Sequence, residues 1–167
     1  LASLPVGEDG LILFGGSQVM LGYLDDPEKT AEVIVEMDGK RWYKTGDKGH
    51  LDQDGFLTIV DRYSRFAKIG GEMISLGAIE SEIGKVVPEN IEVLTTAIPD
   101  GKKGEKVILL FAGDIGNDEM KGFIEQSGIN PLMRPAELIN VEAIPKLGSG
   151  KNDFSRAKQL AMEACAS

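Results

Sequence analysis

Three stretches of the chain place charged side chains beside glycines, a combination suited to binding phosphates and sugar hydroxyls. The first is Tyr43-Lys44-Thr45-Gly46-Asp47. An ionised carboxylate offers several acceptor positions, so Asp47, at the end of a predicted strand, could accept hydrogen bonds from both hydroxyls of a ribose. The alternative is a turn aspartate that satisfies its own backbone, since Gly-Asp pairs are common in turns.

The second stretch, residues 61–71, combines a basic cluster with a double glycine. Three cations fall within seven residues, and a Gly-Gly pair follows them: Arg62, Arg65, Lys68 and Gly70-Gly71. Such a cluster could hold a phosphate or a ribose hydroxyl. It could equally be a solvated edge, the more frequent fate of charges on short strands. The double glycine predicts a tight turn between two short strands.

The third stretch is Ile-Pro-Lys-Leu-Gly-Ser-Gly-Lys at 144–151, which ends in Lys151. It is not a nucleotide-binding P-loop, because the first glycine position holds Pro145 and the final Ser/Thr position holds Asn152. A lysine on a Gly-Ser-Gly loop should be mobile, and its point charge suits a phosphate or a carboxylate. The competing interpretation is a plain surface lysine ahead of a helix.

Composition excludes several classes of protein. The net charge is -9, from 18 basic and 27 acidic residues, which disfavours nucleic-acid binding. One cysteine and one histidine make an internal disulfide impossible and a zinc cluster implausible. The longest apolar run, 107–112, is far too short to span a membrane. The chain opens on Leu1, without a signal-peptide pattern, so we expect a fragment of a longer protein.

The elements around these stretches predict an α+β fold in two parts. Strands and turns dominate the first sixty residues, with one helix capped by Asp26 and running to about Val35. From about Ser64 the pattern becomes mixed. Helices are expected at 76–87, 117–127 and from 154, and strands at 92–98, 106–112 and 137–144. The last helix should turn one set of side chains inward: Phe154, Ala157, Leu160, Ala161 and Ala164. The boundary should fall at 61–65.

Taken together, the three stretches resemble the motifs of the adenylate-forming superfamily, which includes acyl-CoA synthetases, luciferases and the adenylation domains of peptide synthetases. Residues 15–30 resemble the family's approach to its Thr-Gly-Asp motif, and 43–47 match that motif. Asp61-Arg62 and Lys68-Ile69-Gly70-Gly71 are similar to the hinge and the hairpin after it. Residues 145–151 resemble the final motif with its lysine. The resemblance covers essentially the whole chain.

Two segments, 65–76 and 147–154, resemble one branch of the superfamily more narrowly. This branch is the synthetase half of bifunctional acyl-[acyl-carrier-protein] synthetase/2-acylglycerophosphoethanolamine acyltransferases. Such enzymes activate a fatty acid with ATP, load it on acyl carrier protein and re-acylate a lysophospholipid. Two departures stand out. Ser64 occupies a hinge position where many relatives carry Asp, and the family's phosphate loop and most of its acyl pocket are absent.

The resemblance implies a role for each candidate residue. Residues 1–62 would be the end of the large domain, mainly β and barrel-like, and 63–167 a small mobile lid with a mixed sheet and helices. Ser64 would be the hinge and Lys151 the catalytic residue. The residues expected to bind the cofactor are Asp47, Arg62, Lys68, Gly70 and Gly71. The cofactors would be ATP/AMP and Mg²⁺, with the metal ligands lying before Leu1.

The implied partners are acyl carrier protein or coenzyme A, a fatty acid and the remainder of the parent chain. The implied location is cytoplasmic, with the parent enzyme at the inner face of the bacterial membrane. A plain acyl-CoA or aryl-acid ligase and a non-catalytic interaction domain of the same fold stay open as alternatives. Docking of an acidic carrier protein would need a local basic patch, either Arg65 with Lys68 or Lys102, Lys103 and Lys106.

Overall fold

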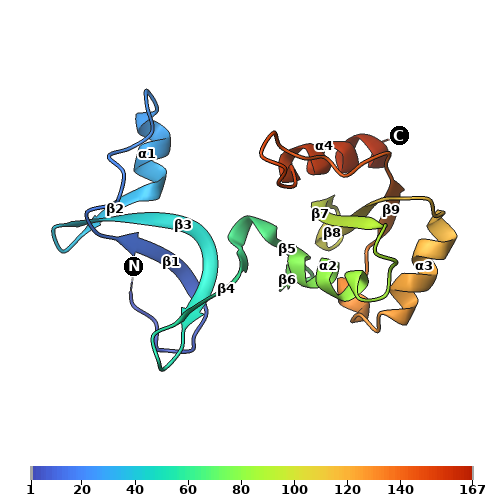
Figure 1. Ribbon diagram of the computed structural model, residues 1–167, viewed down its shortest axis with the longest axis horizontal. Helices are drawn as coiled ribbons and strands as arrows, with labels where there is room; N and C mark the ends of the chain where they lie inside the picture. Colours follow the sequence, from blue (N-terminus) through green and yellow to red (C-terminus); the bar gives the residue numbers. More distant parts are fainter. Residues whose placement is uncertain (1, 167) are drawn as a thin grey trace. The chain divides into compact units, whose positions relative to one another are not determined.

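Two β-sheets, one in each half of the chain, organise this computed structural model, which describes residues 2–166. The chain divides between Ser64 and Arg65 into two compact units, Leu1–Ser64 and Arg65–Ser167. The division lies inside the window 61–65 in which the sequence places a boundary. Figure 1 shows the first unit in blue to green and the second in green to red.

The first unit is an antiparallel sheet built around one long strand, β3, which pairs with all three of the other strands. Its elements in chain order are β1 (Gly10–Gly15), helix α1 (Pro27–Val33), β2 (Ile34–Met37), β3 (Lys40–Leu51) and β4 (Leu57–Arg62). Figure 1 shows β3 as a strongly curved ribbon. A 3₁₀ turn, η1 (Tyr63–Arg65), follows β4 and leads into the second unit.

Helix α1 begins as the sequence predicts but ends two residues earlier. The side chain of Asp26 accepts a hydrogen bond from the Lys29 N–H, and proline occupies the first helical position. After Val33 the chain enters β2, which pairs with the start of β3 around Asp38-Gly39. Both turn residues have positive φ, 53° and 67°, as a two-residue hairpin turn requires. The β-branched residues before this turn therefore form a strand instead of a third helical turn.

The second unit combines a mixed five-stranded sheet with three helices. Its strands are β5 (Phe66–Ile69), β6 (Glu72–Ser75), β7 (Glu92–Asp100), β8 (Gly104–Ala112) and β9 (Glu137–Asn140). The strand order is β6-β5-β8-β7, and β9 pairs with β8 in parallel. The helices are α2 (Leu76–Gly84), α3 (Asn117–Gln126) and α4 (Phe154–Cys165), with a short 3₁₀ turn, η2 (Pro131–Met133), before β9.

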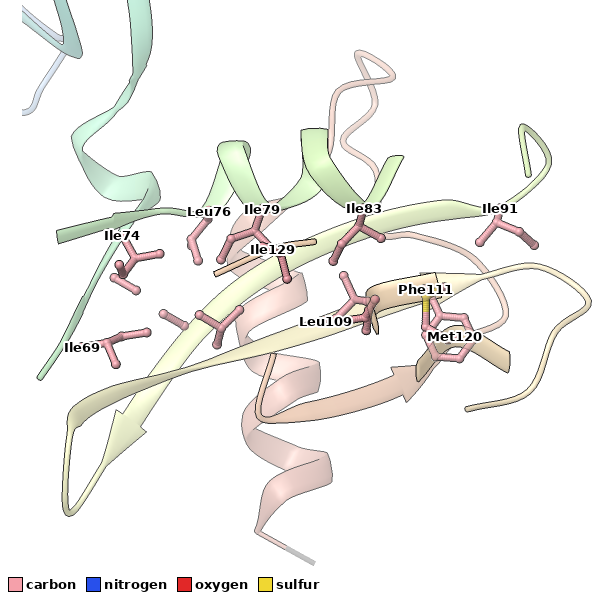
Figure 2. Close-up of a cluster of buried hydrophobic side chains, with 14 residues drawn as sticks. Ile69, Ile74, Leu76, Ile79, Ile83, Ile91, Leu109, Phe111, Met120 and Ile129 are labelled. Atoms are coloured by element: carbon pink, nitrogen blue, oxygen red, sulfur yellow. The ribbon is translucent and has the colours of Figure 1, made fainter. Parts of the chain in front are cut away.

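Both faces of β8 are buried, as expected for a central apolar strand. Alternate residues point to opposite faces of a strand. Val107, Leu109 and Phe111 therefore join the cluster beneath α2 and α3, shown in Figure 2. Ile108 and Leu110 join a second cluster with the residues of α4. The α+β class and the positions of these helices and strands confirm the main expectations for the second half of the chain.

Several details of the second unit differ from the expectations. Helix α2 ends at Gly84, three residues early. Helix α3 is capped by Gly116 without a side-chain hydrogen bond, so Asn117 is its first residue and not its cap. Strand β9 ends at Asn140, four residues early. On α4, Ala157 and Ala161 are buried, whereas Phe154 and Ala164, also expected to point inward, are exposed, and Cys165 packs against the cluster. Positions spaced by four lie on one helix face, which continues the stripe to residue 165.

Candidate functional site

The Thr-Gly-Asp motif forms a bulge in β3. Leu11 of β1 lies opposite Lys48 and Leu13 opposite Lys44, so three residues of β3 face the single residue Ile12. Gly46 takes a φ of 79° within this bulge, a conformation that favours glycine. The Thr45 hydroxyl donates to the Ile12 carbonyl (2.9 Å) and accepts from the Asp47 N–H (3.0 Å). The conformation of Gly46 and the hydrogen bonds of Thr45 and the Asp47 N–H thus stabilise the bulge.

The bulge directs Asp47 toward Arg62 on β4, the next strand of the sheet. The two residues are directly opposite each other, and the Arg62 Nε donates to the Asp47 Oδ1 at 2.9 Å. This hydrogen bond is the main cause of a raised pKa for the Arg62 guanidinium. The carboxylate therefore pairs with a cation, and it retains acceptor capacity for further hydroxyls. Two of the predicted binding residues are brought together here.

A hollow of about 450 Å³ lies beside this motif in the first unit. Thr45 and Tyr43 contribute to it from β3, and the other lining residues are Phe14, Gln18, Val19, Met20 and Tyr23. A side-chain hydrogen bond with Tyr23 is the main cause of a raised pKa for the Tyr43 phenol. No local sequence pattern indicates this hollow, although the stretch 15–30 that resembles the approach to the motif supplies four of its residues.

Ser64 and Arg65 have opposite surroundings although they are neighbours in η1. Ser64 is exposed, whereas Arg65 is 6% exposed. The guanidinium of Arg65 forms an ion pair with Glu80. The expectation that Arg65 belongs to a phosphate-binding cluster or to a solvated edge is therefore wrong, because its charge is buried and already paired. It cannot contribute to a docking patch either.

The double-glycine turn lies beside the turn between β7 and β8, and the two turns border a pocket of about 490 Å³. Gly70 and Gly71 have φ of 59° and 94°, which this tight turn requires. The Gly70 N–H donates to the Lys103 carbonyl (2.9 Å). The pocket is lined by Lys68, Gly71, Lys103, Gly104 and Glu105.

Two lysines from separate parts of the sequence therefore share one pocket. The Lys68 N–H donates to Glu105 Oε2 at 2.7 Å, so the carboxylate lies against the backbone of β5. From the sequence, Lys68 and Lys103 are expected in two alternative basic patches. Their meeting depends on the pairing of β5 with β8 at Ile69 and Gly104, which no local pattern indicates.

The other lysines of that turn divide into two kinds. Lys102 is exposed, and its N–H donates to Asp100 Oδ1. The backbone N–H groups of Lys103 and Lys102 lower the pKa of the Asp100 carboxyl. Lys106 instead forms an ion pair with Glu137 on β9. The expected patch of three lysines is thus reduced to Lys102 and Lys103.

The loop that carries Lys151 is closed by hydrogen bonds and is not the loose stretch expected from its glycines. The Leu147 N–H donates to the Lys151 carbonyl, and the Gly150 N–H to the Leu147 carbonyl, both at 2.8 Å. Lys146 and Asn152 form an isolated β-bridge at its base. Asp153 then caps α4 by accepting from the Arg156 N–H (2.9 Å). The Lys151 side chain is exposed on a defined hairpin-like loop.

Residues 2–166 contain neither a candidate metal site nor a candidate membrane-spanning helix. No group of three or more His, Cys, Asp or Glu side chains in this range is placed to hold a metal ion. Residues 2–166 thus do not supply a site for the Mg²⁺ that the resemblance implies. None of the helices in the same range is long and apolar enough to cross a bilayer.

Comparison with known proteins relates the chain to one group of enzymes. No protein-family model matches it. It is 35% identical over 159 residues to a 2-succinylbenzoate–CoA ligase of Listeria monocytogenes, which covers 95% of the chain and 33% of the ligase. It is also 35% identical over 153 residues to 4-coumarate–CoA ligase 2 of Nicotiana tabacum, which covers 89% of the chain and 27% of that ligase. The chain thus spans about a third of the length of these relatives or less.

Solved structures give the same relation. ATP-bound MatB from Rhodopseudomonas palustris superposes with a TM-score of 0.80 at 25% identity, over 96% of this chain and 32% of MatB. The o-succinylbenzoate CoA synthetase MenE from Bacillus subtilis, in complex with the acyl-adenylate intermediate OSB-AMP, gives 0.74 at 25% identity, over 93% and 31%. In sequence and in fold, the chain is therefore similar to part of acid–CoA ligases and related adenylate-forming enzymes.

Proposed function

We propose that this chain is the C-terminal portion of an ATP-dependent ligase that activates a carboxylic acid as an acyl-adenylate and transfers it to coenzyme A. The observation that carries the proposal is the presence, in a chain similar to CoA ligases over 95% of its length, of Asp47, Arg62 and Lys151 with their side chains at least partly exposed. A non-catalytic interaction domain of the same fold has no need of these three residues.

In this proposal the two units have different roles. Residues 1–62 form the end of the large domain, and 63–167 form the lid, which changes orientation about Ser64. Ser64 is exposed within a single 3₁₀ turn, a local structure that a few dihedral changes can alter. The residues on either side of it belong to separate units.

Asp47 and Arg62 would hold the nucleotide. The Asp47 side chain is 25% exposed and Arg62 61% exposed, so both are accessible to a ligand on the first unit. A carboxylate that accepts one hydrogen bond from Arg62 can still accept those of two ribose hydroxyls. Arg62 would keep the carboxylate oriented, and it could reach the sugar with its remaining N–H groups.

Lys151 would serve the adenylation half-reaction. Negative charge builds on the α-phosphate when the acyl carboxylate attacks it, and a fixed cation nearby lowers that barrier. Because the loop of Lys151 is closed by its own hydrogen bonds, the lysine would be carried by the lid as a whole. Withdrawal after adenylation would then come from lid movement and not from a flexible loop.

The pocket shared by Lys68 and Lys103 would receive the thiol substrate. Coenzyme A carries phosphate groups at one end and a narrow pantetheine arm at the other. Two lysines beside a glycine turn suit both parts, because the cations attract phosphate and Gly70 and Gly71 allow a chain to approach the backbone closely. Glu105 is held against the Lys68 N–H, which satisfies one of its oxygens.

Acyl carrier protein is a second candidate acceptor, with a fatty acid as the substrate. The resemblance of 65–76 and 147–154 to acyl-[acyl-carrier-protein] synthetases favours it, and Lys102 and Lys103 offer a small exposed basic surface. The net charge of -9 opposes the approach of an acidic carrier. The relatives named above are CoA ligases, which favours coenzyme A as the main reading.

The test compares two thiol acceptors with the full-length gene product that contains this chain. ATP–pyrophosphate exchange with a panel of aryl and fatty acids would identify the acid. Coenzyme A and carrier protein with a free pantetheine thiol would then be offered separately to the preformed acyl-adenylate. Thioester formation with coenzyme A at least about tenfold faster than with carrier protein, a difference of about 1.4 kcal/mol, supports the proposal. The reverse preference supports the second candidate, and no exchange with any acid contradicts both.

A further inference from the structure

Arg65 is the first residue of the second unit, and its guanidinium is buried. Its Nη2 lies 2.5 Å from Glu80 Oε2 on α2, and its Nη1 donates to the Thr95 carbonyl of β7 at 3.1 Å. The side chains of the pair are 7% and 20% exposed. Two different elements thus fix the plane of the guanidinium, which a planar fork of donors allows.

Glu80 is held from the other side as well. Its Oε1 accepts from the Thr95 N–H at 2.6 Å and lies 3.0 Å from the Thr95 hydroxyl. That hydroxyl also lies 2.9 Å from the Leu76 carbonyl at the start of α2. Arg65, Glu80 and Thr95 therefore form one connected network with defined geometry on both sides of the charge pair.

The open face of the guanidinium is covered by an aromatic ring. The Arg65 Cζ lies 4.2 Å from the centroid of Phe154, the first residue of α4, which is well within the range of a cation–π contact. Phe154 is 42% exposed, so the ring is not part of either buried cluster. Its contact with Arg65 gives it a fixed partner outside the core.

Phe154 also follows the lysine loop almost at once. Only Asn152 and Asp153 separate it from Lys151, and the backbone of each is held by hydrogen bonding. Asn152 forms the bridge with Lys146, and the Asp153 N–H donates to the Pro145 carbonyl (2.8 Å). A displacement of the ring would therefore be transmitted to the loop through a short, hydrogen-bonded segment.

We propose that Arg65 is a positioning residue for Lys151. Through the ring of Phe154 it joins the first residue after Ser64 to the start of α4 and so to the lysine loop. The loop then keeps one placement relative to the end of the hinge segment whenever the lid turns. The consequence for catalysis rests on the function proposed for Lys151, whereas the positioning itself does not.

The test compares four variants of the full-length gene product by hydrogen–deuterium exchange. Phe154→Leu keeps an apolar side chain but loses the ring face, and Arg65→Lys keeps the charge but loses the planar fork. The double variant completes a cycle. Arg156→Lys, an exposed position on the same helix, is the control. The readouts are the loop amides of 146–153 and, as a measure of global stability, the amides of β8.

Each single variant should raise exchange of the loop amides about tenfold while β8 exchange in Phe154→Leu stays unchanged, because only local opening becomes easier. The double variant should show no more than the larger single effect, since both remove one contact. Unchanged loop exchange in Phe154→Leu, or equal increases in the loop and β8, would overturn the positioning role. Because Phe154 lies outside the core, this arm remains informative even if Arg65→Lys fails to fold.

A kinetic measurement separates this inference from the proposed function. In Phe154→Leu the kcat of adenylation should fall about tenfold with KM for ATP within about twofold, because a misplaced lysine loses transition-state contact before it loses binding. Faster loop exchange with unchanged adenylation would support positioning and remove Lys151 from the chemistry. Slower adenylation with unchanged loop exchange would overturn the positioning and leave the proposed function standing.

Discussion

The two units that carry the candidate site residues differ in how much apolar core they bury. In the second unit, two clusters of buried apolar side chains cover both faces of the β7–β8 pair. In the first unit, Val19 is the one buried apolar side chain among residues 2–64. Its sheet instead exposes large apolar groups along and beside β4, including Phe56 at 71% and Ile59 at 62%. The second unit has the core of a domain, and the first does not.

This difference explains how each unit can hold a site. In the second unit, the lysine loop and the glycine turn are attached to a packed sheet, so their geometry follows from the core. In the first unit, Asp47 is oriented by local devices, a bulge and a cross-strand ion pair. Large apolar side chains exposed together in this way normally mark a surface covered by another part of a protein. We propose that the remainder of a large domain covers it.

The largest expected effect tests the core itself. Phe111 is fully buried, so Phe111→Ala should destabilise the second unit by about 3–5 kcal/mol. Ile59→Ala, on the exposed face of the first unit, should change stability of the 167-residue chain by no more than about 0.5 kcal/mol. Urea unfolding followed by circular dichroism would measure both.

The full-length gene product sharpens the same comparison. There Ile59→Ala should become costly, because we propose that the parent chain buries this face. A loss of stability for Ile59→Ala in the 167-residue chain equal to that for Phe111→Ala would show that the first unit has a core of its own.

The next effect concerns Lys151 in the full-length gene product. Lys151→Ala should slow adenylation by roughly two to three orders of magnitude, the size of losing one charge-stabilising donor. Thioester formation from supplied acyl-adenylate should fall much less. Lys146→Ala, in the same loop but paired with Glu92, is the matched control and should leave adenylation nearly unchanged. Equal losses in both half-reactions would mean that the lysine is not specific to adenylation.

A smaller effect is expected at the basic pocket. Lys103→Ala should raise KM for coenzyme A about tenfold, because a cation–phosphate contact is worth about 1.5–3 kcal/mol. Lys102→Ala, its exposed neighbour outside the pocket lining, should change KM less. Steady-state kinetics at fixed ATP and acid would measure both. A larger effect at Lys102 would indicate a docking surface for a protein instead of a pocket for coenzyme A.

Local patterns predicted most of the second unit because its elements obey simple periodicities. The apolar run of β8, the Asp153 cap and the double-glycine turn each indicate their own structure within a few residues. The same reasoning failed where the outcome depends on distant pairing. Helix α1 was extended into β2 because the hairpin partner lies beyond the turn. The predicted apolar stripe of α4 is wrong at both ends, because Phe154 and Ala164 are exposed and Cys165 packs inward.

Site residues divide in the same way. Asp47, Arg62 and Lys151 could be proposed from their motifs, and the ion pair of Asp47 with Arg62 agrees with grouping them. The burial of Arg65 could not be read from a cluster of three cations, because its partner Glu80 lies on another element. The pocket shared by Lys68 and Lys103 could not be predicted from the sequence either, since it depends on a single pair of residues where β5 contacts β8.

The smallest expected effect is the loss of folding stability as pH falls, which we compare for one ion pair in each unit. A hydrogen bond from Lys106 lowers the pKa of Glu137 in the second unit, and hydrogen bonds from His50 and Lys48 lower that of Asp9 in the first. A carboxyl whose pKa is lower in the folded state binds its proton more readily when unfolded. Its stabilising contribution is therefore complete above its ordinary pKa of about 4 and is lost as pH falls through the lower folded value.

Both ion pairs are partly exposed, so the effects should be small. Glu137→Gln should flatten the acid limb of the unfolding curve below about pH 5, because the second unit unfolds as one cooperative core. Asp9→Asn should leave that limb unchanged, because the first unit contributes little to the cooperative transition. Urea midpoints measured from pH 6 to pH 3 would show the difference, with Glu142→Gln, an exposed position on the second unit, as control. An equal flattening by Asp9→Asn would mean that the two units unfold together, and that the first unit is stabilised by more than its own sheet.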